Sequence, residues 1–302
     1  MTEFSATDAA LEGFRVTREH SRDVLFWGGV EFVVSMAMVT LMLSVAGPEI
    51  HQVMQLGAAG GHPDPNQVLG LIGRLAPVIL ATVPISIGVQ TVFSCAIYRA
   101  VLTPGARGRL FNLDLGVGEW KAFLANLLAG GAIFLAYMLG VVAAALISTV
   151  AGAVGGGWLG GLFAFLSLLA VAAGLIYLVL RLSLVSVIAF VTHHVALKPS
   201  IAMTKGRVAT LLGVFVMALF LALLVYILGT VINMALQGVT AAAWKPASDI
   251  LRSTDVSLAA LYNPIVLAST LFTSLFQILA RVIMTAPGAH IYQALKGRGV
   301  VV

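Results

Sequence analysis

Residues 123–180 read FLANLLAGGAIFLAYMLGVVAAALISTVAGAVGGGWLGGLFAFLSLLAVAAGLIYLVL and contain no Asp, Glu, Lys or Arg. A helix that crosses the hydrocarbon core of a bilayer needs about 20 apolar residues. The stretch is long enough for two such helices, and a run of glycines between Gly152 and Gly161 divides it. It therefore predicts two membrane-spanning helices joined by a tight turn.

The rest of the chain has the same character. It has 302 residues, of which 60% are hydrophobic and 10% charged, whereas soluble domains carry about 25% charged residues. This composition excludes a soluble globular domain, a disordered chain and a nucleic-acid-binding domain. Six segments are long and apolar enough to span a bilayer, approximately 24–46, 71–98, 123–150, 159–180, 209–236 and 264–285.

We therefore predict an all-α, polytopic membrane protein with six transmembrane helices arranged as three hairpins. The whole chain, 1–302, forms a single membrane domain in this interpretation. Residues 1–23 are a cytoplasmic amphipathic segment, 24–285 the transmembrane bundle, and 286–302 a cytoplasmic tail.

The distribution of basic residues predicts the topology. Fourteen of the 17 Lys and Arg residues fall on one side of the six helices, and only Arg74, Lys245 and Arg252 fall on the other. Cytoplasmic loops carry the excess of Lys and Arg in membrane proteins, so both termini are expected in the cytoplasm. The net charge of +5 then reflects topology and requires no nucleic-acid partner.

Each predicted hairpin follows a short segment of mixed polarity, at 9–23, 113–121 and 199–207. We expect these segments to be short helices at the cytoplasmic membrane interface. The ends of two hairpins also resemble each other, with AIYRAV at 96–101 and HIYQAL at 290–295. Together these features suggest a unit of interfacial helix plus hairpin that is used three times.

The same stretches carry a family resemblance. AIYRAVL at 96–102, followed by Pro104 and by LDLG at 113–116, resembles a block in uncharacterised bacterial six-helix membrane proteins. RLSL at 181–184, followed by AMTKGR at 202–207, is similar to a second block. These proteins resemble the membrane domain fused to some glycerophosphoryl diester phosphodiesterases and, more loosely, YciC-type inner-membrane proteins. The resemblance implies a bacterial inner membrane and a lipid-related context, and it brings no catalytic residues.

Glu31 is the most informative single residue. It lies about eight residues, or roughly 10–12 Å, into the first predicted helix. A charge at the bilayer centre costs about 2.5–3.5 kcal/mol on insertion scales, so Glu31 should face the bundle or water and have a partner. We predict a buried ion pair with Arg181 or Arg281. Such a pair is either a packing lock between helices or a substrate site.

A second group of basic residues, Arg99, Arg107 and Arg109, lies in the second connection. Lys and Arg near a membrane surface attract anionic lipids, so these residues are candidate contacts for lipid head groups. The alternative is that they reflect only the positive-inside bias.

Other polar residues within the predicted helices are Gln90, Asn126, Asn233, Asn263 and Gln277. We expect most of them to form hydrogen bonds between helices. His193 and His194 diverge by about 100° on a helix and have no acidic or cysteine neighbour, and Cys95 is the only cysteine. We expect no metal site, no cofactor and no catalytic residues, because no nucleophile–base pair or carboxylate pair has the required spacing.

The sequence predicts a non-enzymatic integral inner-membrane protein, a lipid-associated scaffold or accessory subunit of a membrane complex. Its expected partners are membrane lipids, anionic ones in particular, or another membrane protein. The alternative is a small permease for a lipid or small solute that uses the buried Glu/Arg site.

Overall fold

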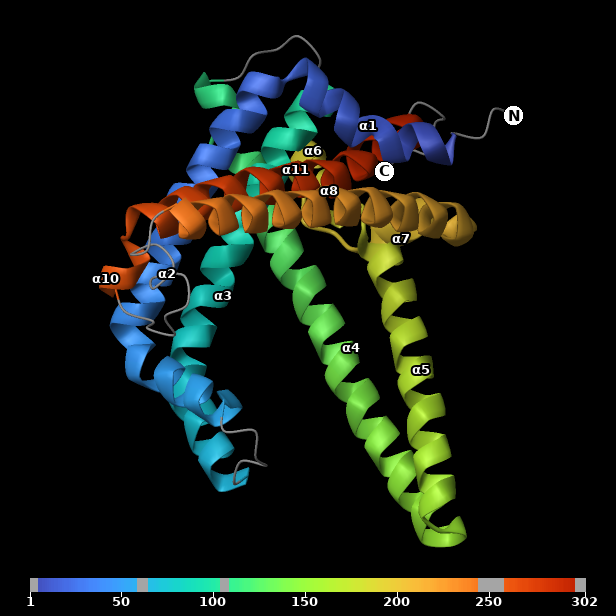
Figure 1. The fold of residues 1–302 in the computed structure, drawn as a ribbon. Helices are drawn as coiled ribbons and strands as arrows, with labels where there is room; N and C mark the ends of the chain where they lie inside the picture. The colour runs from blue at the N-terminus through green and yellow to red at the C-terminus, as the bar shows by residue number, and fades with distance from the viewer. Residues whose placement is uncertain (1–4, 59–64, 104–108, 244–257, 297–302) are drawn as a thin grey trace. The chain divides into compact units, whose positions relative to one another are not determined.

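The computed structural model describes residues 5–58, 65–103, 109–243 and 258–296, and this part of the chain is helical without a strand (Figure 1). Six of its helices are long and apolar enough to cross a membrane. They are α2 (Ser21–Ala58), α3 (Pro65–Leu102), α4 (Val117–Gly155), α5 (Gly157–Leu182), α8 (Val208–Ala243) and α11 (Pro264–Lys296). The predicted class, an all-α polytopic membrane protein with six spanning helices, is therefore confirmed.

Short elements lie between the long helices. They are α1 (Ala6–Glu19), the 3-10 turn η1 (Arg109–Asn112), α6 (Val185–Thr192), α7 (Lys198–Thr204) and α10 (Leu258–Leu261). The first and third segments expected to be short helices correspond to α1 and α7. The second does not, because residues 113–116 are not helical and α4 begins directly at Val117. The repeat of three interfacial helices and three hairpins stays a prediction.

The spanning helices are longer than the apolar segments predicted from the sequence. Hydropathy detects only the part of a helix that fits the hydrocarbon core. The sixth, expected to end near residue 285, continues through Pro287 to Lys296. The first has non-helical backbone at Ala46 (φ −128°, ψ 21°), two residues before Pro48, and then resumes to Ala58. A proline inside a helix removes a hydrogen-bond donor and clashes with the preceding turn, which accounts for the break close to Pro48. The break coincides with the end of the predicted apolar run at residue 46.

The contacts of the chain group into two compact units, each assembled from separate stretches. The first comprises Met1–Glu12, Thr91–Met217 and Thr285–Val302, and the second Gly13–Gln90 and Ala218–Met284. Four helices, α1, α3, α8 and α11, contribute residues to both units. The assignment of 1–302 to a single membrane domain stays a prediction.

In the first unit, α4 and α5 form an antiparallel hairpin that turns at Gly156 (Figure 1). Gly156 has φ +80°, a conformation that glycine adopts without steric cost. Near the turn a Cβ atom on Gly160 would lie 3.1 Å from the Cα of Gly152, so small residues permit close packing of the two helices. The predicted tight turn in the glycine run is confirmed, and the two helices pack closely beside it.

In the second unit, α1 packs against α11 through Gly13. A Cβ atom at this position would lie 2.4 Å from the Cα of Ile283 and 3.1 Å from the carbonyl oxygen of Val282. Both atoms belong to the backbone of α11, so a side-chain rotation cannot relieve the clash. Glycine at position 13 therefore sets the distance between the two helices.

The variant Gly13→Ala is expected to lower the free energy of unfolding by about 1–3 kcal/mol, the usual cost of overpacking. Gly29→Ala is the matched control, because a Cβ there would meet nothing within 4 Å. The control should gain up to about 1 kcal/mol from helix propensity. Thermal unfolding of the solubilised full chain, followed by circular dichroism, measures both. Equal shifts in the two variants would contradict the predicted packing constraint.

Candidate functional site

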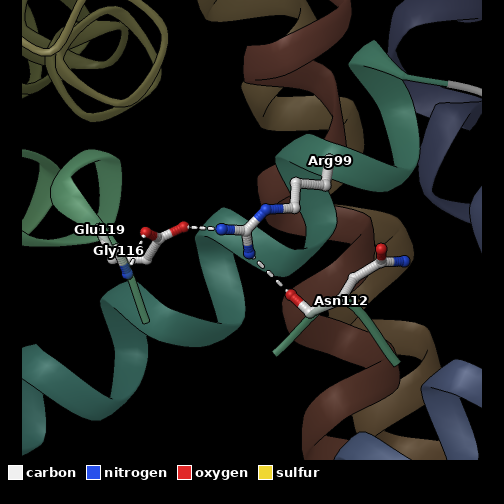
Figure 2. Close-up of polar contacts among 4 residues, drawn as sticks. All are labelled: Arg99, Asn112, Gly116 and Glu119. Carbon is white, nitrogen blue, oxygen red and sulfur yellow. Dashed lines mark hydrogen bonds and ion pairs between the residues drawn. The ribbon is translucent and has the colours of Figure 1, made fainter. Parts of the chain in front are cut away.

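A charged cluster joins the end of α3 to the start of α4 in the first unit (Figure 2). The Arg99 guanidinium donates through Nη2 to a carboxylate oxygen of Glu119 and through Nη1 to the carbonyl oxygen of Asn112, the latter at 2.8 Å. Arg99 lies in the last turn of α3, Asn112 ends η1, and Glu119 is in the first turn of α4. One arginine thus holds three consecutive elements together.

Local backbone geometry places the partners of Arg99. Phe111 and Asn112 both have positive φ, 54° and 66°, a left-handed conformation in which asparagine is enriched among non-glycine residues. This turn presents the Asn112 carbonyl oxygen to the guanidinium. Glu119 is fixed by its second oxygen, which accepts a hydrogen bond of 2.8 Å from the backbone N–H of Gly116 (Figure 2). A carboxylate in the first turn is also stabilised by the helix dipole of α4.

Burial makes this pairing strong. The Glu119 side chain is only 6% exposed and that of Arg99 20%, and the ring of Phe190 lies with its centroid 5.3 Å from the guanidinium carbon. A buried charge is tolerated only when it is paired and hydrogen-bonded. The Glu119 carboxylate is therefore a buried cap at the start of α4, paired with Arg99.

The three arginines proposed as head-group contacts have different positions. Arg99 is engaged by protein partners, as described above. Arg109 opens η1, where the structure describes its backbone, and Arg107 lies outside the described residues. Of these three arginines, Arg99 is the one whose side chain the structure describes, and it lies in a defined polar environment.

A second ion pair lies inside the second unit. Arg281 of α11 donates through Nη2 to Oε1 of Glu31 of α2 at 3.1 Å. Glu31 is ten residues after the start of α2, and its side chain is 9% exposed against 22% for Arg281. The other carboxylate oxygen, Oε2, is buried and accepts no hydrogen bond from the residues that the structure describes. Of the two partners considered from the sequence, the structure brings Arg281 to Glu31.

Arg181 has a different environment, at the end of α5 in the first unit. Its Nε donates to the Tyr177 hydroxyl at 3.0 Å and its Nη1 to the carbonyl oxygen of Ile201 at 2.9 Å. Its own carbonyl oxygen accepts a 2.7 Å hydrogen bond from the buried hydroxyl of Ser200. Helix α5 ends at Leu182, so Arg181 lies in its last turn and holds α7 against it.

Two predicted interhelical hydrogen bonds are confirmed. Asn126 of α4 donates to the Thr91 hydroxyl of α3 at 2.8 Å, and Asn233 of α8 donates to the Thr273 hydroxyl of α11 at 3.3 Å. Asn263 differs, because its side-chain oxygen accepts from the backbone N–H of Ile265 at 3.0 Å. It therefore caps the start of α11 instead of joining two helices.

The sequence analysis did not identify the contact between Glu12 and His290. The Glu12 side chain is 5% exposed, and its carboxylate lies 3.7 Å from Nδ1 of His290. The two residues are 278 positions apart, and Glu12 lies in the segment 9–23, which was expected to be a short interfacial helix of mixed polarity. A pairing of this kind has no local signal in the sequence.

Within the described ranges, no group of three or more His, Cys, Asp or Glu side chains could hold a metal ion. The chain matches no family model, no curated protein and no solved structure.

Proposed function

We propose that this integral membrane protein is a non-enzymatic, lipid-associated scaffold or accessory subunit of a membrane complex. The observation that carries the proposal is the environment of Arg181. A permease that used Glu31, Arg181 and Arg281 would need all three to face one path. The guanidinium of Arg181 is held by Tyr177 and by the backbone of α7, which favours a structural role for it.

The exposed apolar surfaces of the spanning helices support the same proposal. In α4 and in α5, the most apolar 18-residue window has no residue buried within the chain. Large side chains such as Val154 and Trp158 are 84% and 72% exposed. Apolar surface of this extent requires lipid or the helices of another membrane protein.

The proposed location is the bacterial cytoplasmic membrane, with both termini in the cytoplasm. The support is the excess of Lys and Arg on one side of the spans, interpreted by the positive-inside rule. We expect a lipid-related context because the sequence resembles the membrane domain of glycerophosphoryl diester phosphodiesterases and, more loosely, YciC-type proteins.

Native mass spectrometry after gentle extraction from the source membrane tests the proposal. The expected result is a chain that retains either a stoichiometric protein partner or one enriched lipid class. Chemical crosslinking in intact membranes provides the second measurement. A chain that retains no lipid and crosslinks to no protein would contradict the scaffold role.

The second candidate is a permease for a lipid or small solute. The observation that favours it is the buried oxygen Oε2 of Glu31, which accepts no hydrogen bond from the described residues and would accept one from a polar solute that entered the helix interface. Purified protein in vesicles, assayed for movement of a fluorescent phospholipid between leaflets, distinguishes the two functions. Movement that Glu31→Gln abolishes would favour the permease, and the absence of movement in the unmodified protein would favour the scaffold.

A further inference from the structure

A cavity of about 600 Å³ opens at the end of α3 in the first unit. Its walls come from three elements distant in sequence, with Arg99 and Leu102 from α3, Phe190 and Val191 from α6, and Tyr292 and Lys296 from α11. The volume falls within the range of about 300–1,000 Å³ that is typical of small-molecule sites. The stretches that line it include the two similar hairpin ends, AIYRAV and HIYQAL.

The charges around this cavity are unbalanced. Two cationic side chains, Arg99 and Lys296, line it, and no acidic side chain does so among the described residues. Glu119 does not line the cavity, but its carboxylate neutralises the charge of Arg99 through the ion pair drawn in Figure 2. Lys296 is exposed, and its ammonium lies 6.0 Å from the centre of the Tyr292 ring. The cavity therefore has an excess positive charge that an anion would neutralise.

Arg99, which lines the cavity, has more N–H donors than its protein partners use. A guanidinium has five N–H donors in a planar fork, and the contacts to Glu119 and Asn112 each use one terminal nitrogen. The contact with Glu119 fixes the orientation of the guanidinium. Glu119 is thus a positioning residue for the binding group.

The remaining wall is apolar. Leu102, Phe190 and Val191 contribute it, and all three belong to segments within the candidate membrane spans. A free inorganic anion would leave this surface uncovered, whereas the glycerol and first acyl carbons of a lipid would cover it. Removing apolar surface from water contributes about 25 cal/mol per Å², so an amphiphile is favoured over a bare anion.

We propose that this cavity binds the phosphodiester head group of an anionic phospholipid, with Lys296 and Arg99 as the cationic contacts. The inference rests on the proposed lipid association and assigns it a site and a ligand class. Two basic groups and an apolar wall in one cavity distinguish it from general attraction of basic loops to a charged membrane.

The test is a titration of the purified full chain with phosphatidylglycerol, followed by native mass spectrometry, with phosphatidylcholine as the neutral comparison. Lys296→Ala is expected to weaken phosphatidylglycerol binding about fivefold, the factor that corresponds to about 1 kcal/mol per basic residue near a membrane surface. Lys205→Ala is the matched control, because Lys205 is an exposed lysine of the same unit that does not line the cavity. Phosphatidylcholine binding should not change in either variant.

A second variant, Val191→Trp, fills the cavity while both cations remain. It should also weaken phosphatidylglycerol binding, whereas general surface attraction would be unaffected. Circular dichroism confirms that each variant is folded.

Equal losses in the Lys296 and Lys205 variants, or no loss in either, would overturn the site while leaving lipid association intact. Equal binding of the two lipids by the unmodified chain would also overturn it. Displacement of phosphatidylglycerol by millimolar inorganic phosphate would show that the cavity binds the phosphate group without the lipid's apolar part. That result would contradict a lipid ligand. Failure of the proposed lipid-associated scaffold would give a different result in native mass spectrometry, because the chain would then retain neither lipid nor protein partner after extraction.

Discussion

The variant Glu119→Ala is expected to lower the free energy of unfolding by about 3–5 kcal/mol. Removing one partner of a buried ion pair leaves the other charge without compensation, and the cost is of this size. Here the uncompensated charge is Arg99, which is 20% exposed. The variant also removes the acceptor for the Gly116 N–H at the start of α4, the N3 half of a capping box.

The control for this experiment is Glu19→Ala. Glu19 pairs with Arg15 at 2.9 Å, but the Glu19 side chain is 43% exposed and that of Arg15 40%. Exposed pairs contribute about 0.2–1 kcal/mol because water screens them. Chemical unfolding of the two variants in the same detergent measures the difference. If Glu119→Ala were as mild as Glu19→Ala, the cluster of Figure 2 would not hold α3, η1 and α4 together.

The second large effect is expected for Arg281→Ala, which leaves Glu31 buried without its ionic partner. The expected loss of stability is about 3–5 kcal/mol, measured by thermal unfolding of the protein in detergent. The Glu31 side chain is 9% exposed, so little water reaches it to replace the guanidinium. A variant with unchanged stability would contradict the importance of this pair.

The double variant Glu31→Leu with Arg281→Leu separates a packing lock from a binding site. Replacing both members of a buried pair by apolar residues is often neutral or stabilising, so this variant should recover the stability that Arg281→Ala loses. A packing lock also predicts that the double variant keeps the lipid and partner retained by the unmodified chain. Recovered stability together with loss of a retained ligand would assign the pair to a binding site.

The features of this chain that its sequence predicts are local ones. The six spanning helices could be predicted because the cost of placing each residue in hydrocarbon adds up along a continuous segment. The turn at Gly156 could be predicted because its glycine run is contiguous. The need of Glu31 for a partner could also be predicted, since an unpaired charge inside a bilayer is costly wherever the rest of the chain lies.

The identity of that partner required tertiary structure. The sequence does not choose between Arg181 and Arg281, and only the end of α5 at Leu182 and the hydrogen bond to α7 show that Arg181 is engaged elsewhere. For Glu119, a solvated carboxylate and a buried one have the same sequence context. Its burial depends on Arg99, twenty residues earlier, and on the left-handed turn at Asn112.

Six helices long and apolar enough to span a membrane, and the need of buried charges for partners, can be derived from the sequence, because both follow from transfer energies of single residues. Which charges meet depends on the folded chain, in which α3, α6 and α11 surround the cavity of Arg99 and Lys296. Residues about 200 positions apart in the chain line that cavity, and no local pattern encodes their distance in space.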